Sequence, residues 1–173
     1  MPMIDAVIPE GALTPAAEAV LIREVTDILL AHEEGLDPGN ARAQAVSVLF
    51  LHRPQVFVAG APADAPRYRF IPQVPDGQYG DGARFASLVR QITEAVARAE
   101  AAPFDAVSPR VWVFPAEIAD GRWGARGVVR RLPDIVGYLL GEAAAPAAAA
   151  RLESLQRQRA LTLLRQALGP AES

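Results

Sequence analysis

The feature that most constrains how this chain folds is a weak internal repeat. Ile22–Asp27 in the first half matches Val89–Glu94 in the second, and Pro9–Gly11 matches Pro75–Gly77. Self-similarity at a fixed spacing indicates that one supersecondary unit is used twice. A chain of 173 residues has room for two such units around a real core.

Each copy is predicted to be a β-α-β unit. In the first copy, residues 2–8 form a short and mostly apolar strand. Thr14 and Pro15 then begin a helix, as its N-cap and its first helical residue. Apolar side chains recur at helical spacing as far as Leu29, and a second apolar run over residues 45–51 is β-like.

The second copy repeats this order. It has a strand over residues 68–74, a helix with an apolar face between Phe85 and Val96, and a returning strand over residues 110–114. The predicted fold class is therefore α+β, with two tandem β-α-β units forming a four-stranded mixed sheet and two helices on one face. The other face of such a sheet stays apolar and open, and oligomerisation is the simplest way to cover it.

The predicted organisation has three parts. Residues 1–60 form the first unit and residues 66–141 the second, and together they make one compact domain. Residues 142–173 form a C-terminal helical extension, because the sequence from Pro146 to Leu168 is rich in Ala, Leu and Arg. We expect this amphipathic helix to dock on its own oligomer; a partner-binding helix or a partly mobile tail is the alternative.

Composition excludes several kinds of chemistry. All 17 basic side chains are arginine, so a lysine Schiff base is excluded, and the absence of cysteine excludes thiol catalysis and disulfides. His32 and His52 are the only histidines, which argues against a histidine-rich metal site. We expect no metal or organic cofactor.

Charge and hydropathy bear on whether the protein binds nucleic acid or a membrane. The net charge of −3 gives no reason to expect nucleic acid. No signal peptide or membrane span is recognisable, so we expect no membrane partner and a cytoplasmic location.

Pro2 is the leading catalytic candidate. It follows Met1, and removal of Met1 would leave Pro2 with a free secondary amine. An amine can act as a base only when it is unprotonated, and burial in an apolar pocket lowers the pKa of an amine. A terminal proline on a buried strand is therefore a plausible general acid/base. The alternative is an ordinary proline after the initiator.

These residues together resemble the tautomerase superfamily. Residues 1–34 are similar to 4-oxalocrotonate tautomerase in Pro2, in Glu10–Gly11 and in Leu21–Val25, and residues 117–124 resemble the family's glycine-rich hairpin. The resemblance covers roughly residues 1–130. The fused arrangement is similar to the macrophage migration inhibitory factor and malonate semialdehyde decarboxylase groups, and to carboxymethyl-hydroxymuconate isomerase. It implies a homotrimer with one amino-terminal proline per subunit and active sites near subunit boundaries.

The chain departs from the family where the family's arginines bind a dicarboxylate. After the Glu-Gly turn it has Ala12 in the first unit and Gln78 near that place in the second. Within the second strand of each unit it has Val46 and Trp112. The family's decarboxylases carry an Arg-x-Arg pair after the third strand, whereas Arg67–Arg69 precedes it here and is given no role.

The other candidate site residues are cations and aromatic or polar side chains that the repeat places near strand ends. The predicted substrate-binding residues are Arg42, Arg110, Arg84, Phe57, Trp123, Trp112 and Tyr79. Arginine suits a substrate carboxylate or a developing oxyanion, and an aromatic wall excludes water. The alternatives are surface arginines and ordinary aromatic packing.

Three hypotheses of function follow. The first is a cofactor-independent tautomerase or isomerase of a small keto/enol carboxylic acid, with Pro2 as general acid/base. The second keeps the site for hydration, dehalogenation or decarboxylation by a protonated Pro2, and it needs a water-activating carboxylate, for which Asp37 is the candidate. The third is a non-catalytic trimeric binding protein with the same fold, which the missing arginines favour.

Overall fold

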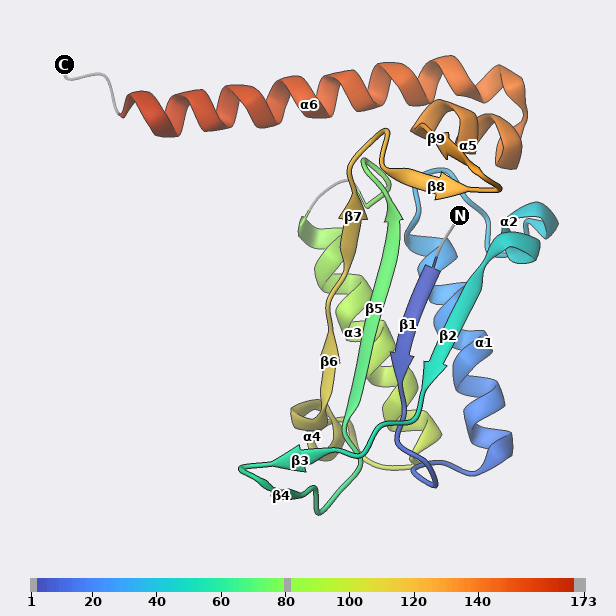
Figure 1. Cartoon of the computed structure of the whole chain (residues 1–173), viewed down its shortest axis with the longest axis vertical. Helices are drawn as coiled ribbons and strands as arrows, with labels where there is room; N and C mark the ends of the chain where they lie inside the picture. The colour runs from blue at the N-terminus through green and yellow to red at the C-terminus, as the bar shows by residue number, and fades with distance from the viewer. Residues whose placement is uncertain (1–2, 80–81, 170–173) are drawn as a thin grey trace. The chain divides into compact units, whose positions relative to one another are not determined.

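The computed structural model describes residues 3–79 and 82–169, which fall into two compact units that divide between Ile118 and Ala119 (Figure 1). In chain order the first unit contains β1 (Met3–Val7), α1 (Pro15–His32), α2 (Ala41–Val46), β2 (Val48–His52), β3 (Phe57–Val58), β4 (Ala61–Pro62), β5 (Tyr68–Pro75), α3 (Gly82–Ala99), α4 (Phe104–Val107), a 3₁₀ turn (Ser108–Arg110), β6 (Val111–Val113) and β7 (Ala116–Ile118). The second unit contains β8 (Trp123–Ala125), β9 (Val128–Arg130), α5 (Leu132–Leu140), a 3₁₀ turn (Glu142–Ala144) and α6 (Ala145–Leu168).

The sheet of the first unit is mixed, in the order β2-β1-β5-β6, and β7 also pairs with β5. β1 runs parallel to β2 and antiparallel to β5, while β5 runs parallel to both β6 and β7. β6 and β7 follow one line along β5 and are separated only by residues 114–115. The predicted fold class is therefore confirmed, with two β-α-β units joined through the pairing of β1 with β5.

One face of this sheet is covered by helices. In Figure 1, α1 and α3 lie side by side behind the strands. The core contains alternate residues of the strands, such as Ile4 and Phe70, together with the apolar faces of α1 and α3, such as Leu29 and Ile92. Burying side chains of this size stabilises the fold by about 1.5–3 kcal/mol each, so the core fixes which face each strand turns inward.

Local sequence determines where two of the elements, α1 and β2, begin. α1 begins as predicted, because Thr14 Oγ1 accepts a hydrogen bond of 3.2 Å from the Ala17 N–H and Pro15 occupies the first turn. The strand predicted over residues 45–51 was wrong at its start. Asn40 caps the short helix α2 by accepting from the Ala43 N–H at 3.0 Å, so β2 begins only at Val48.

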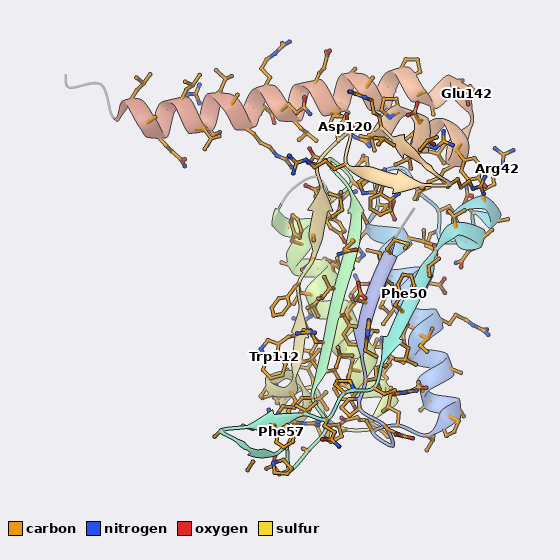
Figure 2. All side chains as sticks on the ribbon, in the orientation of Figure 1. Arg42, Phe50, Phe57, Trp112, Asp120 and Glu142 are labelled. Carbon is orange, nitrogen blue, oxygen red and sulfur yellow. The ribbon has the colours of Figure 1, made fainter. Side chains whose placement is uncertain are left out.

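The opposite face of the sheet carries large apolar side chains that no helix of the first unit covers. Val48 and Phe50 on β2 are 40% and 47% exposed, and Trp112 and Phe114 at β6 are 42% and 51% exposed (Figure 2). On the same face, His52 Nε2 lies 2.8 Å from a carboxylate oxygen of Asp5, within hydrogen-bond distance. We call the face of the sheet that carries these residues, opposite α1 and α3, the open face.

The second unit is a small hairpin and helix assembly. β8 and β9 pair antiparallel, and α5 packs against the first half of α6 through Leu132, Val136, Ala148 and Leu152. The prediction of a helix from Pro146 to Leu168 is confirmed. Within the part of the chain that the structure describes, no helix combines the length and the apolar character needed to cross a membrane.

Candidate functional site

The topology gathers several chain segments at the end of the sheet where β1 begins. Met3 pairs with Val48 at the start of β2 and with Gln73 near the end of β5. α1 runs back along β1 and therefore ends at the same place, next to the turn that follows β5. We call this region the β1-start end. Pro2 lies outside the described residues, and its chain neighbour Met3 is the first residue of this region.

Glu33 is the most unusual side chain at the β1-start end. It caps the C-terminus of α1 through its backbone and is only 1% exposed. A carboxylate loses most of its hydration in such a place, and burial therefore raises the pKa of Glu33 above its ordinary value of 4.5. A buried acid whose charge is disfavoured is more typical of a functional site than of a helix terminus.

The turn after β5 forms the floor beside Glu33. One carboxylate oxygen of Glu117, on β7, accepts hydrogen bonds from the N–H groups of Gly77 at 3.0 Å and Tyr79 at 3.1 Å. The Glu34 N–H donates to the Gln78 carbonyl at 3.1 Å, so the end of α1 is tied to the same turn. These bonds fix the backbone of the turn after β5.

Tyr79 is held inside this turn. Its side chain is fully buried, its hydroxyl donates to the Pro72 carbonyl at 3.3 Å, and its ring packs on Phe85 with 4.9 Å between centroids. Burial, reinforced by the nearby carboxyl groups of Glu33 and Glu117, raises the pKa of Tyr79. Tyr79 therefore stays protonated and is a hydrogen-bond donor at every physiological pH.

Two of the predicted arginines also lie at the β1-start end. Arg84, on the first turn of α3, forms an ion pair of 2.7 Å with Glu34, and both side chains are about one-third exposed, at 34% and 39%. Arg42 is on α2, directly before β2, and is exposed (Figure 2). Arg42 and Arg84 are thus the predicted cations that share an end of the sheet with Met3.

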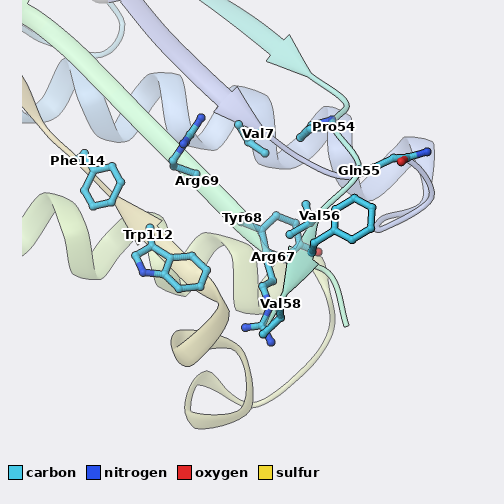
Figure 3. Close-up of a pocket in the computed structure, with 11 residues that line it drawn as sticks. Val7, Pro54, Gln55, Val56, Val58, Arg67, Tyr68, Arg69, Trp112 and Phe114 are labelled. Carbon is cyan, nitrogen blue, oxygen red and sulfur yellow. The ribbon is translucent and has the colours of Figure 1, made fainter. Parts of the chain in front are cut away.

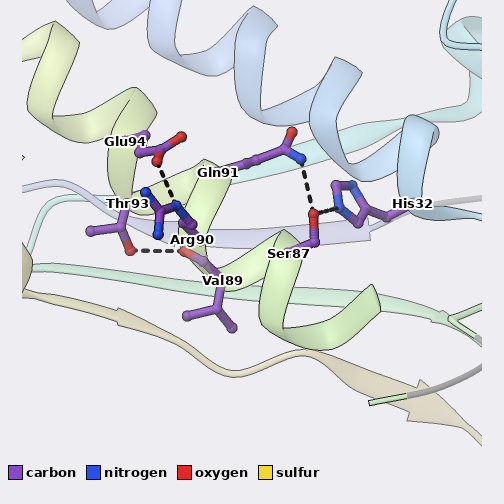
Figure 4. Close-up of polar contacts among 7 residues, drawn as sticks. All are labelled: His32, Ser87, Val89, Arg90, Gln91, Thr93 and Glu94. Atoms are coloured by element: carbon purple, nitrogen blue, oxygen red, sulfur yellow. Dashed lines mark hydrogen bonds and ion pairs between the residues drawn. The ribbon is translucent and has the colours of Figure 1, made fainter. Parts of the chain in front are cut away.

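His32 has a structural place beside this region. Its Nδ1 lies 2.7 Å from the Ile28 carbonyl, which can only accept, so Nδ1 carries the proton. Its Nε2 lies 3.0 Å from the Ser87 hydroxyl oxygen, which also accepts a hydrogen bond from the Gln91 side chain at 3.0 Å (Figure 4). His32 therefore links α1 to α3 through its two ring nitrogens.

Two further predicted site residues of the first unit lie at the other end of its sheet, and a third belongs to the second unit. Phe57 and Trp112 both line a cavity at the opposite end of β1, where Val7 is located (Figure 3). Trp123 begins β8 in the second unit and is buried. The structure thus brings Tyr79, Arg84 and Arg42 to one end of the sheet and Phe57 and Trp112 to the other.

Arg110 is engaged in an ion pair. Its two terminal nitrogens donate to the Glu100 carboxylate at 2.8 and 2.6 Å, and one of them also donates to the Pro66 carbonyl at 2.6 Å. The hydrogen bond from Arg110 holds the pKa of Glu100 below its ordinary value of 4.5. Its role in substrate binding stays a prediction, and its geometry favours a role in holding the start of β6.

Sequence reasoning passed over Glu33 and Glu117. Glu33 and Glu34 directly follow the apolar pattern of α1, and the spacing of apolar residues does not reveal which of two adjacent acids turns inward. In the described residues, no group of three or more His, Asp or Glu side chains is placed to hold a metal ion. The groups that this end offers are a buried acid, Glu33, a half-buried acid, Glu117, a buried tyrosine and two arginines.

The geometry of Arg110 leads to a stability prediction. Its side chain and that of Glu100 are only 16% and 12% exposed, so Arg110→Gln leaves a poorly hydrated carboxylate without its cation. We expect the free energy of unfolding, measured with urea, to fall by about 2 kcal/mol. Arg90→Gln is the matched control; Arg90 pairs with Glu94 while 74% exposed, and its loss should cost about 0.5 kcal/mol or less. Equal losses in both variants would contradict this account of Arg110.

No protein-family model matches the chain, and no curated protein matches it. Solved structures do match. A fused 4-OT protein solved as an asymmetric trimer is 17% identical with a TM-score of 0.57, and the match covers 73% of this chain and 94% of that one. Pt0534, inactivated by 2-oxo-3-pentynoate, is 15% identical with a TM-score of 0.57 and the same coverage of 73% and 94%.

A member of the cis-3-chloroacrylic acid dehalogenase family is also similar, at 15% identity and a TM-score of 0.54, over 75% of this chain and 84% of that one. These structural neighbours are tautomerase superfamily proteins. Identities this low establish the fold alone. The resemblance inferred from the sequence is confirmed at that level: the chain has the fold of the fused tautomerase superfamily proteins.

Proposed function

We propose that this protein is a cofactor-independent tautomerase or isomerase of a small keto/enol carboxylic acid, with Pro2 as its general acid/base. The observation that carries the proposal is the β1-start end, where Met3 opens the central strand beside the buried acid Glu33. Pro2 precedes Met3 directly in the sequence, and we propose that the amine freed by loss of Met1 acts at this end of the sheet.

The environment of Glu33 supports a neutral amine. Burial there disfavours the charged form of a carboxyl group and raises its pKa. The same loss of hydration disfavours an ammonium ion and lowers the pKa of an amine. An unprotonated Pro2 nitrogen can take a proton from an enol hydroxyl, or from the carbon beside a carbonyl, and return it at another carbon. The double bond moves and no atoms are lost or gained.

The substrate carboxylate needs a cation, and Arg84 is well suited to supply it. Its pair with Glu34 lies at the surface, and exposed pairs contribute about 0–1 kcal/mol. Exchange of Glu34 for a substrate carboxylate therefore costs little, while a guanidinium holds a carboxylate through two parallel hydrogen bonds. Arg42 is the second cation that we assign to this end.

We further propose that the protein works as a homotrimer with one proline per subunit. The open face exposes Phe50, Trp112 and Phe114 to about half of their surface, at 47%, 42% and 51%. Large apolar side chains exposed on a sheet are often covered by another element or another copy. Fused 4-OT proteins of the same fold have been solved as trimers.

Glu33 also supports a second candidate, in which Pro2 is protonated and the reaction is hydration, dehalogenation or decarboxylation. An ionised carboxylate beside the amine raises the pKa of that amine and can activate a water molecule. Asp37 is less suited to the latter role, because it lies in an exposed turn where its carboxylate accepts from the Gly39 N–H at 2.8 Å. The similarity to a dehalogenase-family member agrees with this candidate.

The proposal is tested by ketonisation of phenylenolpyruvate with the wild type and with Pro2→Ala. General acid–base catalysis by a positioned group accelerates a reaction about 10²–10⁴-fold, so we expect a loss of at least about 10²-fold in kcat/KM. Intact mass is the control, because both proteins must have lost Met1.

Equal activity in the two proteins would remove Pro2 from the mechanism. Absence of activity in both would count against a tautomerase and favour the second candidate or a non-catalytic trimeric binding protein.

The burial of Glu33 predicts a particular dependence of stability on pH. Its pKa in the folded protein is above the ordinary value of 4.5, so its contribution to stability is present below that value and is lost as the pH rises through the folded pKa. Glu33→Gln removes this titration. We expect the variant to gain stability relative to the wild type as the pH rises from the ordinary pKa of about 4.5 through the raised folded pKa of Glu33.

Urea unfolding at a series of pH values measures this difference, and Glu34→Gln is the matched control for loss of a carboxylate at the β1-start end. A stability difference between Glu33→Gln and the wild type that stays constant with pH would show that Glu33 does not titrate differently in the folded protein.

A further inference from the structure

The second half of α6 exposes an apolar surface. Leu152, where α6 packs on α5, is the last buried residue of the helix, and every residue from 156 to 168 is exposed. The exposed fractions are 47%, 66%, 57% and 82% for Leu161, Leu163, Leu164 and Leu168. Figure 1 shows this half of α6 extending past α5 within the second unit. We call residues 157–168 the distal segment.

The apolar side chains of the distal segment lie on one side of the helix. They form two adjacent rows, each with the spacing i, i+3 and i+7, namely Leu161, Leu164 and Leu168, and Ala160, Leu163 and Ala167. Helical geometry places the two rows side by side, so that together they span about half of the circumference. This face is about a third of a turn away from Ala148 and Leu152, so it does not continue the contact with α5.

The charge of the distal segment is positive. The segment contains Arg157, Arg159 and Arg165 and no Asp or Glu, whereas the whole chain has a net charge of −3. Helical geometry places Arg159 and Arg165 at the two edges of the apolar face, with uncharged Gln and Thr side chains between them on the far side. A partner that covers this face must therefore bring negative charge, and a second distal segment would bring like charge instead.

We infer that the distal segment binds an anionic lipid surface, with the helix lying in the plane of that surface. The leucines enter the boundary between headgroups and acyl chains, and the arginines at the edges of the face reach lipid phosphates. A groove in an acidic protein is matched less well, because helix-in-groove binding uses one row of anchors and here two rows form a broad face. The inference does not depend on the chemistry proposed for Pro2.

This inference replaces two expectations from the sequence. The expectation of no membrane partner rests on the absence of a signal peptide and of a membrane span, and a helix that lies on a membrane requires neither. The other expectation is that the helix docks on its own oligomer. The match to a fused 4-OT protein solved as a trimer covers 94% of that chain and 73% of this one, so that trimer forms without a counterpart of more than a quarter of this chain. The resemblance in the sequence ends near residue 130, before α6 begins.

Flotation with lipid vesicles tests the inference on the full-length protein. We expect the protein to float with vesicles of equal parts phosphatidylcholine and phosphatidylglycerol, and not with phosphatidylcholine alone. Added salt should release it, because salt screens exposed charges. Arg165→Gln should weaken binding by about fivefold, the loss expected for one basic residue near an anionic membrane. Arg90→Gln is the control, because Arg90 is 74% exposed on α3, outside the distal segment, and it should leave binding unchanged.

Leu164→Glu tests the apolar face. It places a carboxylate among the leucines and should weaken binding by at least about tenfold. Val20→Glu is the matched control and should bind as the wild type does, because Val20 on α1 is 64% exposed and Leu164 is 57% exposed. Light scattering should give Leu164→Glu the same mass as the wild type.

Four results would overturn the inference. The first is no flotation with anionic vesicles, which would leave an acidic protein as the partner that the charge requires. The second is equal flotation with neutral vesicles, and the third is wild-type binding by Leu164→Glu. The fourth is a lower mass for Leu164→Glu, which would place the apolar face in a contact between subunits.

Discussion

The antiparallel pairing of β1 with β5 is the interaction on which the rest of the structure depends. It joins the two β-α-β units edge to edge, so that one sheet with one helix-covered face is formed. The same pairing places the start of β1 beside the end of β5, where Glu33 and Tyr79 are buried. It also places the end of β1 beside the start of β5, where Val7 meets Arg69.

The two ends of β1 carry opposite kinds of polar chemistry. At the start, the side chain of Glu33 is buried, and the loss of hydration disfavours its charged form. At the other end, Arg67 and Arg69 line a cavity together with Trp112 and Phe114, and among the described residues that line it none is an Asp or Glu. A protein that moves protons on a small acid benefits from the first environment.

Much of this fold could be predicted from local sequence, and the exceptions have physical reasons. Thr14 and Pro15 predict the start of α1 correctly. A capping side chain and a proline with a fixed φ both act within the first turn, so their effect does not depend on the rest of the fold. The strand predicted from Ala45 begins too early. Asn40 caps the short helix α2, and this helix includes the first residues of the apolar run. Glu33 could not be singled out, since its burial depends on the turn at Gln78 more than forty residues away. The ion pair of Arg110 with Glu100 likewise requires knowledge of how α3 packs beside β6.

The central claim is that Pro2 acts as a neutral base at the β1-start end, and a direct titration of its amine tests it best. With the protein labelled at the proline nitrogen, NMR at a series of pH values gives the pKa of that group. The account predicts a pKa below the ordinary α-amino value of about 8, because burial disfavours the ammonium form. A pKa above that value would contradict it and would assign Pro2 the role of an acid, paired with an ionised Glu33.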